Sequence, residues 1–197
     1  LDAHPDAVLA YPQTLRIDER GEITEKEPRA FETAGRADQG ERWRRFCWSG
    51  VGSGDMVYGL MRLDALRRAG IFRTVLRPDR LLMAELTLLG RIRQVPEVLW
   101  LRRESAATSV SRQRHTLVLA DQAPRWFGAP PWFQHALVLW REYARANPRP
   151  IPLSTLQLVW MVLLYQVSYG WRHLRKSETS HAVGRGIDNA IWIKKVI

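Results

Sequence analysis

Residues 78–103 read PDRLLMAELTLLGRIRQVPEVLWLRR, and this stretch decides the fold class. Pro78 fits the first turn of a helix, where a backbone N–H has no partner within the helix. Four leucines then recur at helical spacing as far as Gly90, which ends the pattern. Beyond it, residues 92–95 and 98–101 predict two short strands on either side of Pro96. A helix followed by strands indicates an α/β fold.

The residues upstream of this stretch predict further strands and one short helix. Residues 7–17 and 56–61 are rich in β-forming side chains, and the second of these segments predicts a buried strand. Residues 63–69 predict a helix closed by Gly70, in the position where a left-handed cap is favoured. Residues 22–40 are mostly polar and poor in aliphatic side chains, which indicates a surface loop.

The character of the sequence changes beyond residue 110. Prolines there separate aromatic segments of helical character, which predicts a mainly α-helical region. We therefore expect two parts. Residues 1–110 should form a mixed sheet with flanking helices, and residues 111–197 should form a helical, aromatic-rich C-terminal extension.

The charge of the chain favours anionic partners. Thirty Lys and Arg residues oppose twenty Asp and Glu residues, which gives a net charge of +10. Cys47 is the only cysteine, so an internal disulfide is excluded, and it lies between Phe46 and Trp48 as a buried apolar side chain would. This cysteine usage favours the cytoplasm. The five histidines have no metal-ligand spacing, so no metal site is predicted from them.

A stretch without any charged residue, from Pro150 to Trp171, has three interpretations. It could pack as a core or oligomer helix, it could lie in the plane of a membrane surface, or it could span a bilayer, for which about 20 residues suffice. The basic residues that follow directly, and the tryptophans Trp160 and Trp171, suit an interfacial position on an anionic leaflet.

Four pairs of short segments resemble one known family. They are residues 4–11 (HPDAVLAY) with 17–21 (IDERG), 58–62 (YGLMR) with 65–70 (ALRRAG), 79–82 (DRLL) with 88–90 (LLG), and 95–99 (VPEVL) with 101–103 (LRR). In this order they look like the second half of the catalytic domain of family-2 glycosyltransferases, which have the GT-A fold. The resemblance covers about the first 110 residues and implies an incomplete GT-A-type mixed sheet.

The resemblance also implies an activity. Such enzymes transfer a sugar from a nucleotide-sugar donor to the hydroxyl of a glycan or lipid-linked acceptor, in the synthesis of cell-surface polysaccharide or glycolipid. In the family, an Asp-x-Asp motif in the donor-binding half holds a divalent cation, Mg²⁺ or Mn²⁺, against the donor diphosphate. The 197 residues contain no Asp-x-Asp. We therefore expect a truncated, C-terminal half that is inactive and binds no cofactor alone.

The resemblance assigns roles to five residues of this chain. Asp79 matches the general base, Arg102 and Arg103 match positions that contact the donor diphosphate, and Tyr58 and Arg62 match the acceptor side. All of these assignments except that of Arg62 have a structural alternative. Asp79 could simply stabilise the first turn of a helix, the two arginines could be solvated residues at a strand end, and Tyr58 could belong to the core.

One position departs from the family pattern. Where members of the family often have a histidine that completes the metal shell, this chain has Glu104, so no metal ligand is assigned here.

A competing interpretation comes from a different class of function. Residues 41–46 interleave basic and aromatic side chains, and together with the uncharged stretch they are typical of a non-catalytic module that binds an anionic membrane surface or nucleic acid. No known nucleic-acid motif accompanies them, so nucleic acid is the less favoured partner. Either interpretation places the chain in the cytoplasm, with a peripheral position at the inner face of the cell membrane as an option.

Overall fold

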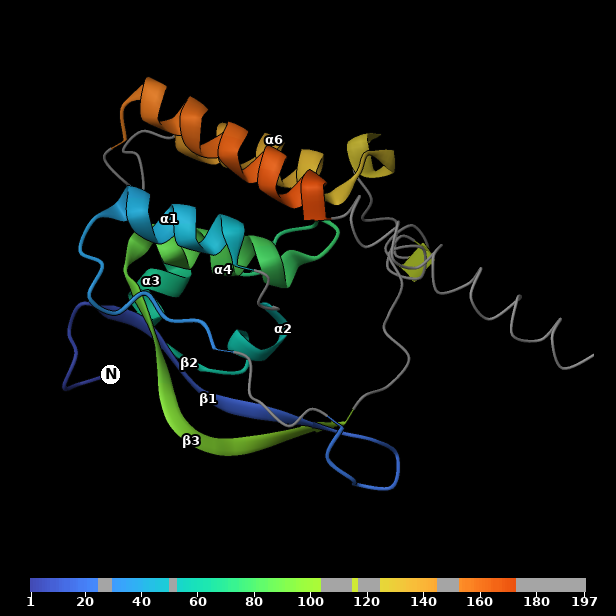
Figure 1. Ribbon diagram of the computed structural model, residues 1–197. Coiled ribbons are helices and arrows are strands. Elements are labelled where there is room, and N and C mark those ends of the chain that lie inside the picture. The colour runs from blue at the N-terminus through green and yellow to red at the C-terminus, as the bar shows by residue number, and fades with distance from the viewer. Residues whose placement is uncertain (25–29, 50–52, 104–114, 117–124, 145–152, 173–197) are drawn as a thin grey trace, which may run out of the picture.

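The computed structural model describes residues 1–24, 30–49, 53–103, 115–116, 125–144 and 153–172 (Figure 1). In chain order its elements are β1 (Ala7–Ile17), α1 (Gln39–Trp48), α2 (Ser53–Met56), β2 (Leu60–Met61), α3 (Leu63–Arg68), α4 (Pro78–Leu89), β3 (Arg91–Arg103), the 3-10 turn η1 (Arg125–Gly128) and α6 (Pro131–Ala144). Residues 155–172 form a further helix, here called the 155–172 helix. The expectation of a mixed α/β fold is confirmed.

The sheet has three strands in the order β2-β1-β3. Strand β2 pairs antiparallel with the start of β1, whereas β3 runs parallel to β1 along its whole length, from Ala7 opposite Arg91 to Ile17 opposite Arg103. The sheet is therefore mixed, as expected. The predicted strand over residues 7–17 has the observed bounds.

The two short strands expected around Pro96 are a single strand, β3. Proline has no N–H to donate to a sheet, so a strand usually ends or bulges at it. Here the chain bulges, because Pro12 lies opposite Val95 while the next residue, Gln13, lies opposite Val98. The register thus skips Pro96 and Glu97, and pairing resumes beyond them.

The buried strand expected over residues 56–61 is wrong. Met56 ends α2, the backbone turns at Gly59, and only Leu60 and Met61 pair with β1. The turn lies tightly against β1, because a β-carbon on Gly59 would stand 2.6 Å from the carbonyl oxygen of Ala10. The close approach of the turn to the β1 backbone interrupts the expected strand, and the local sequence pattern does not reveal this approach.

Helices α3 and α4 begin and end close to their predicted positions. Gly70 follows α3 with a φ of 77°, and Gly90 follows α4 in an extended conformation. The surface loop expected over residues 22–40 ends slightly earlier, because helix α1 begins at Gln39. The side chain of Asp38 caps this helix by accepting a hydrogen bond from the backbone N–H of Glu41 at 2.9 Å.

The helices α1, α3 and α4 cover one face of the sheet, and α6 and the 155–172 helix lie beyond α1 and α4, on the side away from the sheet (Figure 1). The indole N–H of Trp43 donates to the carbonyl of Met161 at 2.9 Å, and its ring stacks on Tyr165 with centroids 5.6 Å apart. One hydrophobic core therefore includes residues of α1, α4, α6 and the 155–172 helix. The expected boundary at residue 110 lies outside the described residues.

Part of the uncharged stretch, residues 155–171, belongs to the 155–172 helix, and one of its faces packs in the core. Within the described part of the chain, no helix combines the length and the apolar character needed to cross a membrane.

Candidate functional site

Asp79 lies in the first turn of α4, and its side chain is partly exposed. Two side chains of α6 fix the backbone that leads into this turn. Gln134 accepts a hydrogen bond from the N–H of Leu76 at 3.0 Å, and Nε2 of His135 is 2.6 Å from the carbonyl oxygen of Leu76. Arg77 then adopts a left-handed conformation with a φ of 57°, which is uncommon for a residue with a β-carbon. The tertiary structure thus determines where the Asp79 carboxylate emerges.

Arg80, the next residue, is surrounded by aromatic rings. Its guanidinium carbon is 4.7 Å from the ring centre of Tyr169, 5.1 Å from that of Phe46 and 5.9 Å from that of Tyr165. Its Nε and Nη2 atoms are buried and have no hydrogen-bond partner among the described residues. The aromatic faces attract the cation but leave these donors unpaired.

A second arginine comes close to Arg80 from the other end of the chain. Arg172, the last residue of the 155–172 helix, donates to the backbone carbonyls of Ser168 and Ser49. Its Nη2 atom is buried and, within the described part of the chain, unpaired. Burial, and next the positive charge of Arg80, lower the pKa of Arg172 from 12.5 to about 10. Two guanidinium groups therefore share one poorly solvated region.

The hydroxyl of Tyr169 marks the centre of this region. Burial raises the pKa of Tyr169, the charges of Arg80, Arg77 and Arg172 oppose that rise, and Asp79 adds to it. The charges of these four groups therefore all act on one hydroxyl. We call Arg77, Asp79, Arg80, Tyr169 and Arg172 the α4 cluster. It combines one accessible carboxylate with three cations, which suits a substrate that carries both a hydroxyl and phosphate groups.

Arg102 lies elsewhere, at the carboxyl end of β3, and pairs with Asp55. Its Nη1 is 2.8 Å from Oδ1 of Asp55, and Nη2 of Arg16 is 2.7 Å from Oδ2 of the same carboxylate. Asp55 is only 5% exposed, so two cations neutralise one buried anion. The guanidinium group of Arg102 also lies close to the backbone of Gly54, since a β-carbon there would stand 2.8 Å from Nη1. This arrangement joins α2 to the ends of β1 and β3.

Arg103 and Arg62 also have backbone partners. Nη1 of Arg103 donates to the carbonyls of Asp18 and Glu19, each at 2.6 Å, at the carboxyl end of β1. Arg62 donates to the carbonyls of Ala7 and Leu1, each at 2.8 Å, at the amino end of β1. The two ends of this strand lie roughly 30 Å apart, at about 3.3 Å per residue. The structure therefore separates the residues that were expected together.

Tyr58 is not a core residue, so the structural alternative that placed it in the core is wrong. Its side chain is 69% exposed and packs against Trp100 with ring centroids 4.6 Å apart. The alternative failed because residue 58 lies in the turn before β2 instead of in a buried strand. Of the five expected residues, only Asp79 belongs to the α4 cluster.

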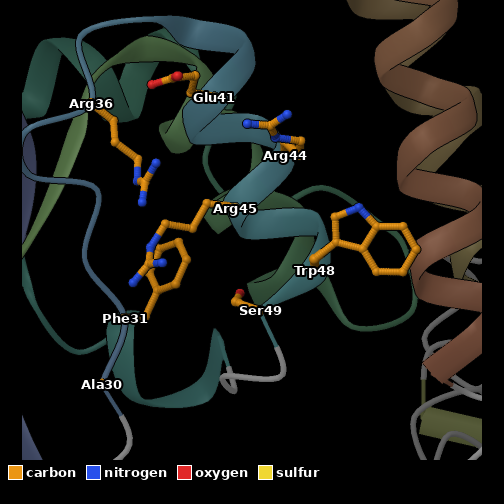
Figure 2. A pocket seen from close by; sticks show the side chains of 8 residues that line it. All are labelled: Ala30, Phe31, Arg36, Glu41, Arg44, Arg45, Trp48 and Ser49. Atoms are coloured by element: carbon orange, nitrogen blue, oxygen red, sulfur yellow. The ribbon is translucent and has the colours of Figure 1, made fainter.

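The surface also carries an open pocket of about 550 Å³ beside α1 (Figure 2). We call it the arginine pocket, and it is lined by Ala30, Phe31, Arg36, Glu41, Arg44, Arg45, Trp48 and Ser49. Arg45 donates through Nε to the carbonyl of Glu32 at 2.7 Å and lies over the ring of Phe31. Figure 2 shows Trp48 directed away from Phe31, toward the 155–172 helix. Three cations and two aromatic rings suit an anionic group with an apolar attachment.

The histidine, cysteine, aspartate and glutamate side chains of the described residues are dispersed. Among them, no three His, Cys, Asp or Glu side chains lie close enough to hold a metal ion. Asp55 pairs with residues near the ends of β1 and β3, and each of its carboxylate oxygens is bound by a guanidinium group. Glu104 lies outside the described residues.

Sequence reasoning missed Arg80 and Arg172 as members of the site. Arg80 directly follows the predicted base, and Arg172 is the first charged residue after the uncharged stretch. Their positions in the sequence could therefore have pointed to them. Their convergence depends on the packing of the 155–172 helix against α1 and α4, and no local pattern encodes it.

Comparisons with protein-family models, with curated proteins and with solved structures gave no match. The resemblance to family-2 glycosyltransferases accordingly rests on the sequence segments quoted above, and we carry the activity forward as a proposal.

Proposed function

We propose that this chain is the acceptor-side half of a glycosyltransferase that moves a sugar from a nucleotide-sugar donor to an acceptor hydroxyl, with Asp79 as general base. One observation carries this proposal. The carboxylate of Asp79 is accessible at the first turn of α4, on a backbone that α6 holds in place, and Arg77 and Arg80 flank it in the chain. A general base needs both access to the substrate and a fixed position.

The reaction assigns a role to each charge. The acceptor oxygen attacks the anomeric carbon and gives its proton to Asp79, while the bond from that carbon to the donor phosphate breaks and leaves its electron pair on the diphosphate. Negative charge therefore grows on the leaving group. Arg80 and Arg172 have unpaired donor nitrogens on the same cluster, whereas Arg102 is paired with Asp55. We therefore assign the stabilisation of the leaving group to the positive charges of Arg80 and Arg172, whose unpaired nitrogens are buried, in preference to Arg102 and Arg103.

The exposed side chains of the sheet support a second, donor-binding half. Leu60 on β2 is 73% exposed, and Leu99 and Leu101 on β3 are 71% and 53% exposed. Apolar side chains this accessible on the edge strands of a sheet are usually covered by further structure. In the proposed enzyme the donor half, with its Asp-x-Asp motif, covers them and supplies the divalent cation.

The test compares two matched substitutions in a polypeptide that contains both halves. Asp79→Asn removes the base, and Asp64→Asn removes the carboxylate from the first turn of α3, where it is exposed and has no proposed role. We expect Asp79→Asn to lower the rate of sugar transfer about 10²- to 10⁴-fold, as loss of a general base does. Asp64→Asn should leave the rate unchanged.

The helix-stabilising alternative makes a different prediction. If both carboxylates act only on the helix dipole, the two variants lose similar small amounts of stability, about 0.3–1 kcal/mol, and keep similar rates. Near-normal turnover by Asp79→Asn, measured as nucleotide release from a panel of nucleotide sugars, would remove Asp79 from the mechanism.

A further inference from the structure

The outward face of the 155–172 helix is apolar over its whole length. Its exposed side chains, here called the apolar row, are Leu156, Val159, Trp160, Leu163, Val167 and Trp171, with exposed fractions from 37% for Val159 to 82% for Leu156. They follow one another at intervals of three or four residues, except for the adjacent pair 159–160, and so lie on one side of the helix. No charged residue occurs between residues 155 and 171.

The opposite face of the same helix is already used. Leu158, Met161, Tyr165 and Ser168 are buried in the core. A helix in a globular protein usually has one apolar face, which packs, and one polar face, which meets water. This helix is apolar on both, so packing among the described residues does not explain the apolar row.

The neighbouring helix extends the apolar surface. Nδ1 of His135 on α6 is 2.7 Å from the Tyr165 hydroxyl, which holds α6 beside the 155–172 helix. Phe133 and Leu137 of α6 are 51% and 37% exposed. Both helices lie on the side of the molecule away from the sheet (Figure 1). The row itself spans roughly 22 Å, at 1.5 Å per helical residue.

Cationic groups lie at the margins of this surface. The arginine pocket begins beside Trp48, which Figure 2 shows directed toward the 155–172 helix, and it contains Arg44 and Arg45. A surface with an apolar centre, tryptophans and arginine margins matches the depth profile of a bilayer, in which acyl chains lie below a layer of phosphates.

From this arrangement we propose that the apolar row is a docking surface for an anionic lipid bilayer. The 155–172 helix lies in the plane of the interface, the side chains of the row enter the acyl region, and the arginine pocket binds lipid phosphate groups. The net charge of +10 favours this occupant over a second copy of the chain, because two such copies repel each other whereas an anionic leaflet attracts each of them. Docking does not depend on glycosyl transfer.

The test is flotation of the full chain with vesicles of phosphatidylglycerol and phosphatidylcholine, against vesicles of phosphatidylcholine alone. Leu163→Glu places a charge in the apolar row, where Leu163 is 58% exposed, and Leu63→Glu places the same charge on α3, where Leu63 is 56% exposed. Both sites are solvent-accessible, so both variants should fold, which circular dichroism checks. We expect binding to the anionic vesicles only, at least tenfold weakened by Leu163→Glu and unchanged by Leu63→Glu.

A third variant tests the arginine pocket. Arg44→Gln with Arg45→Gln should weaken flotation at low salt and have little effect at about 0.5 M salt, where the Debye length is only about 4 Å. Failure of the wild type to float, or equal binding by the two Leu→Glu variants, would overturn the proposal. A third outcome would also overturn it: the wild type forms a dimer in light scattering, Leu163→Glu abolishes that dimer, and the wild type binds no vesicles. The partner of the apolar row would then be a second copy of the chain.

Discussion

The carboxyl group of Glu85 offers a sharp test of the core, because it is completely buried in the middle of α4. Arg73 donates to its Oε1 through Nε at 3.1 Å and through Nη2 at 2.9 Å, and the Tyr143 hydroxyl donates to the same oxygen at 3.4 Å. Burial raises the pKa of Glu85 from 4.5 to about 7 and outweighs these partners, which favour the charged form.

The direction of the pH effect follows from the two states of the chain. The unfolded carboxyl group loses its proton near pH 4.5, whereas the folded one keeps it until about pH 7. The stability that Glu85 contributes is therefore fully present below pH 4.5 and is lost as the pH rises through 7. The difference between the two pKa values corresponds to about 3 kcal/mol, at about 1.4 kcal/mol for each pKa unit.

The assay is urea unfolding of the wild type and Glu85→Gln between pH 4.5 and 8, followed by circular dichroism. Glutamine keeps the shape and the acceptor oxygen but does not ionise. The free energy of unfolding of the wild type, minus that of the variant, should fall by about 3 kcal/mol as the pH rises over this range. Using the difference cancels contributions from other groups.

Glu142→Gln is the matched control. Glu142 pairs with the same Arg73, Nη1 to Oε2, at 3.3 Å, but its side chain is 38% exposed. Its difference curve against the wild type should stay nearly flat, because an exposed ion pair contributes little. Parallel pH curves for the wild type and Glu85→Gln would refute the claim that burial controls the protonation of Glu85.

Three further predictions test the packing of the chain. Burial lowers the pKa of His135 from 6.5 to about 4, so stability should be lost as the pH falls through this range, and His135→Gln should lack that acid loss in the same urea assay. Gly59→Ala should cost about 1–3 kcal/mol because its β-carbon would meet the β1 backbone, whereas Gly128→Ala, with open space, should change the urea midpoint little. Cys47 is buried and burial raises its pKa to about 12, so iodoacetamide should label it only in denaturant, as mass spectrometry would show.

Much of the local structure could be predicted from the sequence, because its causes are local. Pro78 begins α4 through a property of its own backbone, and Gly90 follows the last helical residue as expected. The β-forming residues of 7–17 give β1 its bounds, and Gly70 supplies the left-handed residue after α3. The same reasoning identified Asp79 as a first-turn carboxylate, and the structure places it in that turn.

The rest could not be predicted, because its causes are distant in the chain. The backbone turns between Met56 and Gly59, where a run of β-forming residues predicted a buried strand, since the β1 backbone approaches too closely. Pro96 stays within one strand because β1 pairs on both sides of it and the register skips two residues. These are matters of register and contact, and each involves a partner more than forty residues away.

The sequence by itself therefore determined a basic chain with a mixed α/β first part, a carboxylate at the start of α4 and an uncharged segment with several possible environments. Only the tertiary structure decided what surrounds them. It brought Arg172 to Ser49 across 123 positions, gathered Arg80 and Arg172 around Tyr169, and packed one face of the 155–172 helix while leaving the other apolar and exposed. The environment of a side chain depends on the residues that pack against its segment, and a local sequence pattern does not show which distant residues these are.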